Sequence, residues 1–137
     1  MPLVWIRTTP DIYRKLNLHR DMRSDEAKST EPFLRPFLQE LPGIVAEALS
    51  VPGTEGELTP KDIGIKVEEF GDLDIHQKDV EIIIWANDYP ERREYLDQRT
   101  KRIYFQVMAL LGQDTTSFVW VLLQKGSFIT GNVTNLL

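Results

Sequence analysis

The fold of this chain is indicated most clearly by one stretch near its middle, Val80-Glu81-Ile82-Ile83-Ile84-Trp85-Ala86. Every residue in it except Glu81 is apolar, and most are β-branched or aromatic. A run of this length and composition is typical of a β-strand that is covered on both faces of a sheet. The stretch therefore predicts an inner strand, and the residues on either side of it predict what that strand joins.

The residues after this strand predict a helix and then another strand. In Asp88-Tyr89-Pro90-Glu91, Asp88 can accept the first free backbone amides of a helix, and Glu91 can reach back to close a capping box. Apolar residues then recur at helical spacing up to a natural stop at Gly112: Leu96, Ile103, Tyr104, Val107, Met108 and Leu111. Phe118–Leu123 is a strongly apolar strand, so residues 80–123 predict one βαβ unit.

The first half of the chain shows the same order. Leu3–Ile6 predicts a short strand. Apolar residues at helical spacing between 34 and 49 predict a helix, which we expect Pro42-Gly43 to kink or break. Alternating apolar and polar residues from 63 to 69 predict a strand with one buried face. The two halves predict an α+β domain made of two βαβ units, each with a parallel, right-handed pair of strands.

We expect residues 1–137 to form a single domain, because this length is usual for one. The polar segment 8–31 is long for a connection inside a domain, so we expect it to be an insertion that forms a short helix, an active-site flap or a mobile loop. Residues 126–137 are expected to form a tail, with a short extra strand around Phe128–Thr130.

Composition argues against several classes of function. The formal net charge is −5, whereas a broad nucleic-acid surface needs a basic stripe. No apolar run approaches the roughly 20 residues of a membrane span. Cysteine is absent, the only histidines are His19 and His76, and neither GxxxxGK[ST] nor GxGxxG occurs. We therefore expect no metal, no cofactor, no nucleic acid and no membrane partner, and we expect a cytoplasmic protein.

Three features together resemble the tautomerase superfamily, which includes macrophage migration inhibitory factor, 5-carboxymethyl-2-hydroxymuconate isomerase and 4-oxalocrotonate tautomerase. The chain begins Met1-Pro2 and enters a strand at once, and a Thr59-Pro60 turn leads into a strand over 63–69 that is similar to the family's second strand. The second half then repeats strand, turn, helix and strand. The resemblance covers the start of the chain and residues 33–124, and it implies a four-stranded sheet with two helices on one face, assembled as a homotrimer.

In this family the chemistry is carried by a proline that directly follows the initiator methionine, so the resemblance makes Pro2 the candidate catalytic residue. Removal of Met1 leaves a secondary amine, and a free α-amino group titrates near pH 7.7–8.0. Apolar walls and nearby cations lower that pKa, which makes the neutral amine a usable general base. The resemblance implies a cofactor-free tautomerase or isomerase that moves a proton between carbon and oxygen of a small 2-keto or enol carboxylic acid.

The family also uses cations to hold the anionic substrate and to polarise its carbonyl. In several members the turn after the third strand supplies them. In this chain the resemblance therefore implies Arg92 and Arg93 as substrate-binding residues. It also implies Tyr89, which stands where other members carry an arginine.

Three further residues are implied on the strands. Lys66 lies two residues after Gly64, on the same face, and Gly64 stands where 4-oxalocrotonate tautomerase carries an arginine. Trp120 stands where the family often places an aromatic pocket wall, and Arg7 is a further cation that can point toward the pocket. Leu122 replaces a polar group that helps catalysis in relatives, which weakens a dehalogenase or hydratase reading.

Two other interpretations remain open. The chain can be a relative that kept the fold and lost the chemistry, or an unrelated ferredoxin-like module that binds a small ligand or a protein. The order of strands in the sheet separates the second of these from the tautomerase fold. In either tautomerase-like case, one sheet face would leave Trp5, Trp85 or Trp120 in water, which favours oligomerisation.

Overall fold

The computed structural model of this protein describes residues 2–20, 37–112 and 114–125. Its strands and helices follow the order that the two halves of the sequence predict. They are β1 (Leu3–Thr8), α1 (Pro10–Arg20), α3 (Phe37–Leu49), the short 3₁₀ helix η2 (Pro60–Asp62), β2 (Gly64–Glu69), β3 (Val80–Asn87), α4 (Pro90–Arg93), α5 (Leu96–Leu111) and β4 (Ser117–Gln124). No helix among the described residues is long and apolar enough to span a membrane.

The four strands form one mixed sheet in the order β2-β1-β3-β4. β1 pairs in parallel with β2, β3 pairs in parallel with β4, and the antiparallel contact of β1 with β3 joins the two halves. Each βαβ unit therefore has its own two strands side by side, as predicted. This order excludes the ferredoxin-like alternative, because that fold splits each βαβ unit by a strand of the other.

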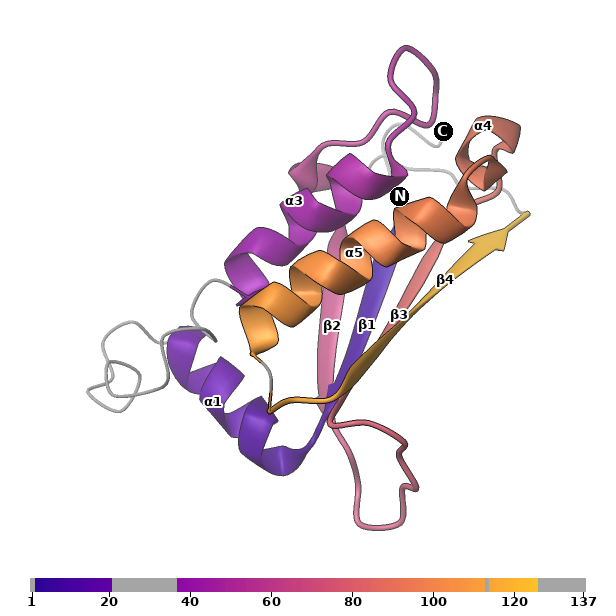
Figure 1. Cartoon of the computed structure of the whole chain (residues 1–137). Helices are drawn as coiled ribbons and strands as arrows, with labels where there is room; N and C mark the ends of the chain where they lie inside the picture. Colours follow the sequence, from indigo (N-terminus) through magenta and orange to yellow (C-terminus); the bar gives the residue numbers. More distant parts are fainter. Residues whose placement is uncertain (1, 21–36, 113, 126–137) are drawn as a thin grey trace, which may run out of the picture.

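Helices α3 and α5 lie side by side across one face of the sheet (Figure 1). Strand residues alternate between the two faces, so every second side chain points at these helices. The side chains that meet there are almost fully buried and form the core: Val4, Ile6, Ile82, Ile84 and Ala86 from the strands, and Leu41, Val45, Leu49, Ile103, Val107 and Leu111 from the helices. The α+β class with helices on one face is thus confirmed.

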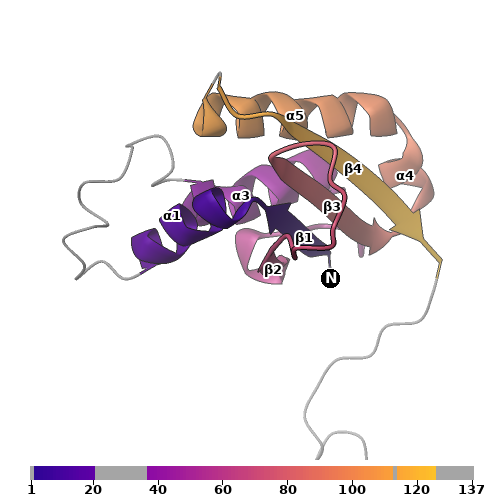
Figure 2. The ribbon, with the colours of Figure 1, turned by 90° about the horizontal axis from the view of Figure 1, so that it is seen from below.

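The opposite face of the sheet is not covered by a helix (Figure 2). On it lie Ile83 and Trp85 of β3, both half-buried, and Trp120 of β4, which is exposed. The prediction that the strand over residues 80–86 is covered on both faces is therefore wrong for the single chain. The continuous apolar run of β3 reflects a core on one side and an uncovered apolar surface, called here the open face, on the other.

The predicted break of the first helix does not occur, because α3 continues through Pro42 as one helix. Proline removes only one backbone donor, and here the turns on both sides of it are held by the core residues Leu41 and Val45, both fully buried. Burial of the apolar stripe outweighs the loss of one hydrogen bond.

The second helix differs from its prediction at its start. Tyr89, not Asp88, is the N-cap, and the chain forms the four-residue α4 before α5 begins. Asp88 is engaged by Arg93 instead of by the helix amides. Between the two helices Tyr95 adopts φ 59° and ψ 30°, a left-handed conformation that costs a non-glycine residue about 1 kcal/mol or more. Gly112 ends α5 as predicted.

We predict that Tyr95→Gly raises the free energy of unfolding by about 0.5–1 kcal/mol, since glycine adopts positive φ without a steric penalty and the exposed tyrosine ring contributes little burial. Urea unfolding followed by circular dichroism measures the change. Tyr95→Ala is the control, because it removes the ring but keeps the Cβ, and it should show no such gain.

Part of the predicted polar insertion at 8–31 is helical. Thr8 closes β1, and α1 follows with Leu16 packed into the core. Residues 21–31 and the predicted tail at 126–137, including its expected strand at 128–130, lie outside the described residues. The proposed flap over a site is therefore still a prediction.

Candidate active site

Pro2 is buried at the start of β1. Its carbonyl oxygen accepts a hydrogen bond from the Gly64 backbone N–H at 3.0 Å, which joins the first residues of β1 and β2. A Cβ on Gly64 would lie 3.9 Å from that carbonyl oxygen and 3.6 Å from Leu3 Cδ1, which is ordinary contact. Because residue 64 is a glycine, no side chain lies at this position beside Pro2.

The β3–α4 turn lies at the same end of the sheet as Pro2. Leu3 is opposite Trp85 in the antiparallel β1–β3 pair, so β3 ends where β1 begins. Asn87 closes β3, Tyr89 caps α4, and α4 lies toward the same end of the sheet as the N-terminus (Figure 1). The topology thus brings together Pro2 and the turn that carries Tyr89, Arg92 and Arg93.

Arg92 is buried, with 1% of its surface exposed. Its guanidinium donates three hydrogen bonds of 2.9 Å to backbone carbonyl oxygens of Leu49, Gly56 and Asn87. It also lies 5.0 Å from the centre of the Tyr89 ring. Burial lowers the pKa of Arg92, but a guanidinium stays charged in proteins.

Arg92 is therefore a structural clamp that ties three segments together. A Cβ on Gly56 would come within 3.3 Å of the Arg92 guanidinium and 3.2 Å of the Tyr89 ring, so glycine is needed there for the close approach. Arg99 extends the clamp, because it donates to the carbonyl oxygens of Ala48 at 2.8 Å and Ser50 at 3.2 Å. The role implied for Arg92 in substrate binding does not fit a guanidinium that is buried and occupied in this way.

Arg93, the next residue, is placed differently. Its side chain is 57% exposed and donates to both carboxylate oxygens of Asp88, at 2.9 and 3.1 Å. Such a two-bond contact orients the guanidinium fork. Arg93 is thus an exposed cation with a fixed direction, in the turn at the Pro2 end of the sheet.

Lys66 and Trp120 lie on the open face. They stand in the row of Trp5, which is two positions further along the sheet than Leu3. Lys66 contacts the Glu68 carboxylate at 2.8 Å, and the Trp5 indole N–H donates to the same carboxylate at 3.1 Å. The bond from Lys66 is the main reason that the pKa of Glu68 is lowered, with the Trp5 bond adding to it.

Trp120 is 55% exposed and lies on the opposite edge of the sheet from Lys66. The register places Lys66, Trp5, Ile83 and Trp120 in one row across four strands. Three interstrand steps of about 4.8 Å separate the edges, or roughly 14 Å. One small ligand cannot touch both residues in a single chain.

Arg7 does not point to this site. It lies five residues along β1 from Pro2, roughly 17 Å away at the rise of a strand, and its guanidinium contacts Asp74 at 3.0 Å. The expectation that Arg7 shares a pocket with Pro2 is wrong, because β1 carries it to the other end of the sheet.

Asp62 is a residue near Pro2 that the sequence analysis did not single out. Its carboxylate accepts the Thr59 backbone N–H at 2.8 Å and the Thr59 hydroxyl at 3.1 Å. These bonds, the backbone one first, lower the pKa of Asp62 and keep it ionised. Asp62 lies two residues before Gly64, the hydrogen-bond partner of Pro2. The pattern Thr59-Pro60-Lys61-Asp62 is a capping-box signature that could have revealed it.

We predict a pH dependence from this bond. The pKa of Asp62 is lower in the folded chain than the usual 3.9 of an unfolded aspartate. The bond therefore stabilises the fold above about pH 4 and is lost as the pH falls through the folded pKa. Thermal melts between about pH 5 and pH 2 should show a smaller loss of stability for Asp62→Asn than for the wild type. Asp72→Asn, an exposed loop variant, should follow the wild-type curve.

No group of three or more histidine, aspartate or glutamate side chains is placed to hold a metal ion in the part of the chain that the structure describes. The ring of His76 stacks on Phe70 at 4.1 Å and contacts the Lys78 carbonyl oxygen.

Three groups are available at the Pro2 end: the buried Pro2, the carboxylate of Asp62 and the exposed guanidinium of Arg93.

Comparison with known proteins identifies the fold. No protein-family model matches the chain, and no curated protein matches it in sequence. The crystal structure of 5-carboxymethyl-2-hydroxymuconate delta-isomerase matches with a TM-score of 0.53 over 99% of this chain and 92% of that one, at 10% identity. A protein of unknown function from Vibrio cholerae matches with a TM-score of 0.49 over 96% of this chain and 85% of that one, at 12% identity. FG41 malonate semialdehyde decarboxylase matches with a TM-score of 0.45 over 98% and 97%, at 17% identity.

Proposed function

We propose that this chain, whose fold is that of the tautomerase superfamily, is a cofactor-independent tautomerase or isomerase of small 2-keto or enol carboxylic acids. Pro2 is the general base after Met1 has been removed. Its secondary amine takes a proton from one atom of the substrate and returns it to another, so that a proton moves between carbon and oxygen and the amine is regenerated.

The position of Pro2 is the observation that carries this proposal. Pro2 is buried directly before Leu3, the first residue of the inner strand β1, and its carbonyl oxygen accepts a hydrogen bond from the Gly64 backbone N–H. Burial disfavours the charged form of an amine, which favours the neutral form of the proline nitrogen once Met1 has been removed. A fixed, neutral amine near the working pH is what a general base requires.

Arg93 is the cation that we assign to the substrate carboxylate. It lies in the turn at the Pro2 end, is exposed, and already presents its guanidinium fork to the carboxylate of Asp88. A substrate carboxylate can take the same two donors. Arg92 holds this turn in place from the core, and the Tyr89 ring packs against both Arg92 and Gly56 as part of that support.

We further propose that the site is completed by association of copies, as the predicted homotrimer implies. Lys66 and Trp120 stand on opposite edge strands and cannot meet one small ligand within a single chain. They can do so only where two copies come together. The open face is the surface available for this, because it carries the exposed side chains Leu3 and Trp120.

Two measurements test the proposed activity. The intact mass of the untagged protein, made in cells with normal methionine processing, should show the loss of Met1. The protein should then accelerate the disappearance of the enol absorbance of phenylpyruvate or 2-hydroxymuconate. Retention of Met1 on every molecule would exclude the mechanism, because Pro2 would then be an amide without a basic nitrogen.

A second candidate is a binding protein that has this fold and no chemistry. It is favoured by the observation that all three cations are engaged by the chain itself. Arg92 donates to backbone carbonyl oxygens, and Arg93 and Lys66 both contact carboxylates. A chain without Met1 that binds 2-keto acids, detected by calorimetry, but does not accelerate the enol decay would support this candidate instead.

A further inference from the structure

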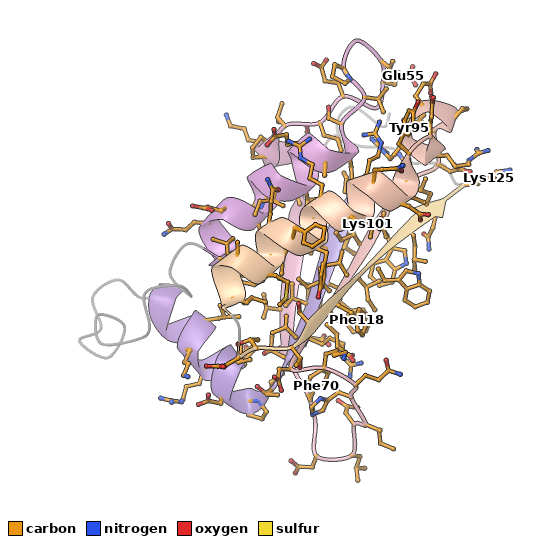
Figure 3. The ribbon with its side chains drawn as sticks, in the orientation of Figure 1. Glu55, Phe70, Tyr95, Lys101, Phe118 and Lys125 are labelled. Carbon is orange, nitrogen blue, oxygen red and sulfur yellow. The ribbon has the colours of Figure 1, made fainter. Side chains whose placement is uncertain are left out.

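The ion pair of Asp88 with Arg93 joins two positions whose backbones are both fixed. Asp88 follows β3, and its backbone N–H donates to the Gln124 carbonyl oxygen at the end of β4 at 3.0 Å. In Figure 3 the label of Lys125, the residue after Gln124, marks this end of the molecule. Arg93 is the last residue of α4, and its backbone N–H donates to the Tyr89 carbonyl oxygen at 2.9 Å. Both side chains of the pair therefore start from an anchored backbone.

Asp88 occupies one edge of the Arg93 guanidinium. A guanidinium is planar and has two edges that each offer a pair of N–H donors, one formed by Nε and Nη2 and the other by Nη1 and Nη2. Nε and Nη2 of Arg93 donate to the two carboxylate oxygens of Asp88, at 2.9 and 3.1 Å. Within residues 2–20, 37–112 and 114–125 the guanidinium makes no other hydrogen bond, so the Nη1–Nη2 edge has no acceptor among them.

A substrate carboxylate can reach Arg93 in two ways. It can displace Asp88 from Nε and Nη2, or it can take the Nη1–Nη2 edge while Asp88 stays in place. The Asp88 side chain is only 11% exposed, whereas that of Arg93 is 57% exposed. Displacement would leave a nearly buried carboxylate without its cation, which is costly because water cannot replace the lost contact. The Nη1–Nη2 edge is reached without this cost.

We infer that Asp88 is a positioning residue, which holds the Arg93 guanidinium so that its Nη1–Nη2 edge receives the substrate carboxylate. This inference rests on the proposed assignment of Arg93 to that carboxylate, but it does not depend on the chemistry of Pro2. The two oxygens of a carboxylate match the two donors of such an edge. An edge fixed in advance therefore favours carboxylates over single-point anions such as chloride.

The gain from Asp88 comes from ordering the arginine before the substrate arrives. A free arginine side chain samples many rotamers, and ordering it on binding lowers the affinity by up to about tenfold. Two bonds to an anchored carboxylate hold the guanidinium in one orientation and remove this cost. The charge of Asp88 acts in the opposite direction, because it repels a substrate carboxylate. Since Arg93 is mostly exposed, solvent and salt weaken that repulsion, and the ordering effect dominates.

The first test measures the binding and turnover of phenylpyruvate, with Kd from calorimetry and KM and kcat from the enol absorbance. Asp88→Ala should raise Kd and KM about tenfold and leave kcat within about twofold, as expected for the loss of uniform binding. Asp88→Asn keeps one acceptor oxygen and removes the charge, so it should raise both constants about threefold. If both variants bind phenylpyruvate more tightly than the wild type, then Asp88 competes with the substrate, and the inference is overturned.

Glu47→Ala is the matched control. Glu47 of α3 contacts Arg102 of α5, so this variant also removes the acidic partner of an exposed arginine and changes the net charge as Asp88→Ala does. It should leave Kd and KM at their wild-type values. Equal weakening of binding by Glu47→Ala and Asp88→Ala would show that the effect is not specific to the pair with Arg93, and would contradict the inference.

Combination with Arg93→Met separates positioning from a merely structural role. If Asp88 acts through Arg93, then Asp88→Ala should have no further effect on Kd in a chain that already carries Arg93→Met. A full additional loss in that chain would show that Asp88 acts on the fold or on the substrate directly, and the positioning role would be wrong. Urea unfolding of each variant shows that the fold is kept, and Asp88→Asn replaces Asp88→Ala in the cycle if the latter is unfolded.

Failure of the proposed function gives a different pattern of results. A wild type that binds phenylpyruvate without converting it excludes the chemistry of Pro2, while the Kd values of the variants still decide the role of Asp88. A wild type that converts the enol, together with an Arg93→Met variant of unchanged Kd and KM, overturns the inference and leaves the activity standing. A wild type that neither binds nor converts phenylpyruvate overturns both.

Discussion

Arg92→Met should destabilise the fold by about 3–5 kcal/mol, because three backbone carbonyl oxygens lose their hydrogen-bond donor in a buried place. The methionine keeps most of the length of the side chain but leaves the carbonyl oxygens of Leu49, Gly56 and Asn87 without their donors in a buried place. Each unsatisfied buried group costs about 1–3 kcal/mol. The change is measured as the shift in the midpoint of urea unfolding.

The neighbouring arginine gives a matched control. Arg93→Met removes an ion pair whose arginine side chain is 57% exposed and whose Asp88 side chain is 11% exposed, so we expect a smaller loss of about 1 kcal/mol. If Arg92→Met unfolds at the same urea concentration as the wild type and only the binding of 2-keto acids suffers, then the clamp interpretation is wrong and Arg92 is a ligand residue after all. Loss of binding in Arg93→Met with normal stability would support the role proposed for Arg93.

Pro2→Ala should lower the rate of enol-to-keto conversion by about 10²–10⁴-fold, the usual contribution of a positioned general base. Alanine keeps a free amine after removal of Met1, but it replaces a secondary amine on a rigid ring by a primary amine on a freely rotating residue. The wild-type rate should rise with pH as the proline amine loses its proton, since only the neutral amine accepts a proton. The enol absorbance of phenylpyruvate, followed over time at several pH values, measures both effects.

Pro52→Ala is the control for this experiment, because Pro52 is an exposed proline in a turn outside the site. It should keep the wild-type rate. Both variants should unfold near the wild-type urea concentration, so that a lost rate cannot be ascribed to lost folding. A Pro2→Ala protein with full activity would show that the secondary amine of a proline is not required for the reaction.

The candidate site shows where sequence reasoning reaches its limit. Arg92 and Arg93 are identical in type and adjacent in the chain, and both were equal candidates from the sequence. The α4 turn directs one into the core and the other into solvent, because consecutive helical residues point about 100° apart. Arg92 is buried because its guanidinium donates to the carbonyl oxygens of Leu49 and Gly56, which lie far from it in the sequence. No local sequence pattern reveals these acceptors.

The helix boundaries also differ from what the local sequence predicts. Asp88-Tyr89-Pro90-Glu91 has the letters of a capping box, but the Asp88 carboxylate is taken by Arg93, and Tyr89 becomes the cap. Pro42 carries a helix-breaking signal, but the burial of Leu41 and Val45 on either side keeps α3 intact. At Pro42 tertiary packing is stronger than the local preference, and at Asp88 an ion pair with a residue five positions on takes the place of the helix cap.

The sequence by itself determined the order of the main strands and helices and the two βαβ halves, because hydrophobic periodicity and turn residues act over short distances along the chain. The tertiary structure alone decided which cations are exposed and that Lys66 and Trp120 stand on opposite edges. These properties depend on contacts between residues far apart in the sequence, and such contacts exist only after the sheet has formed.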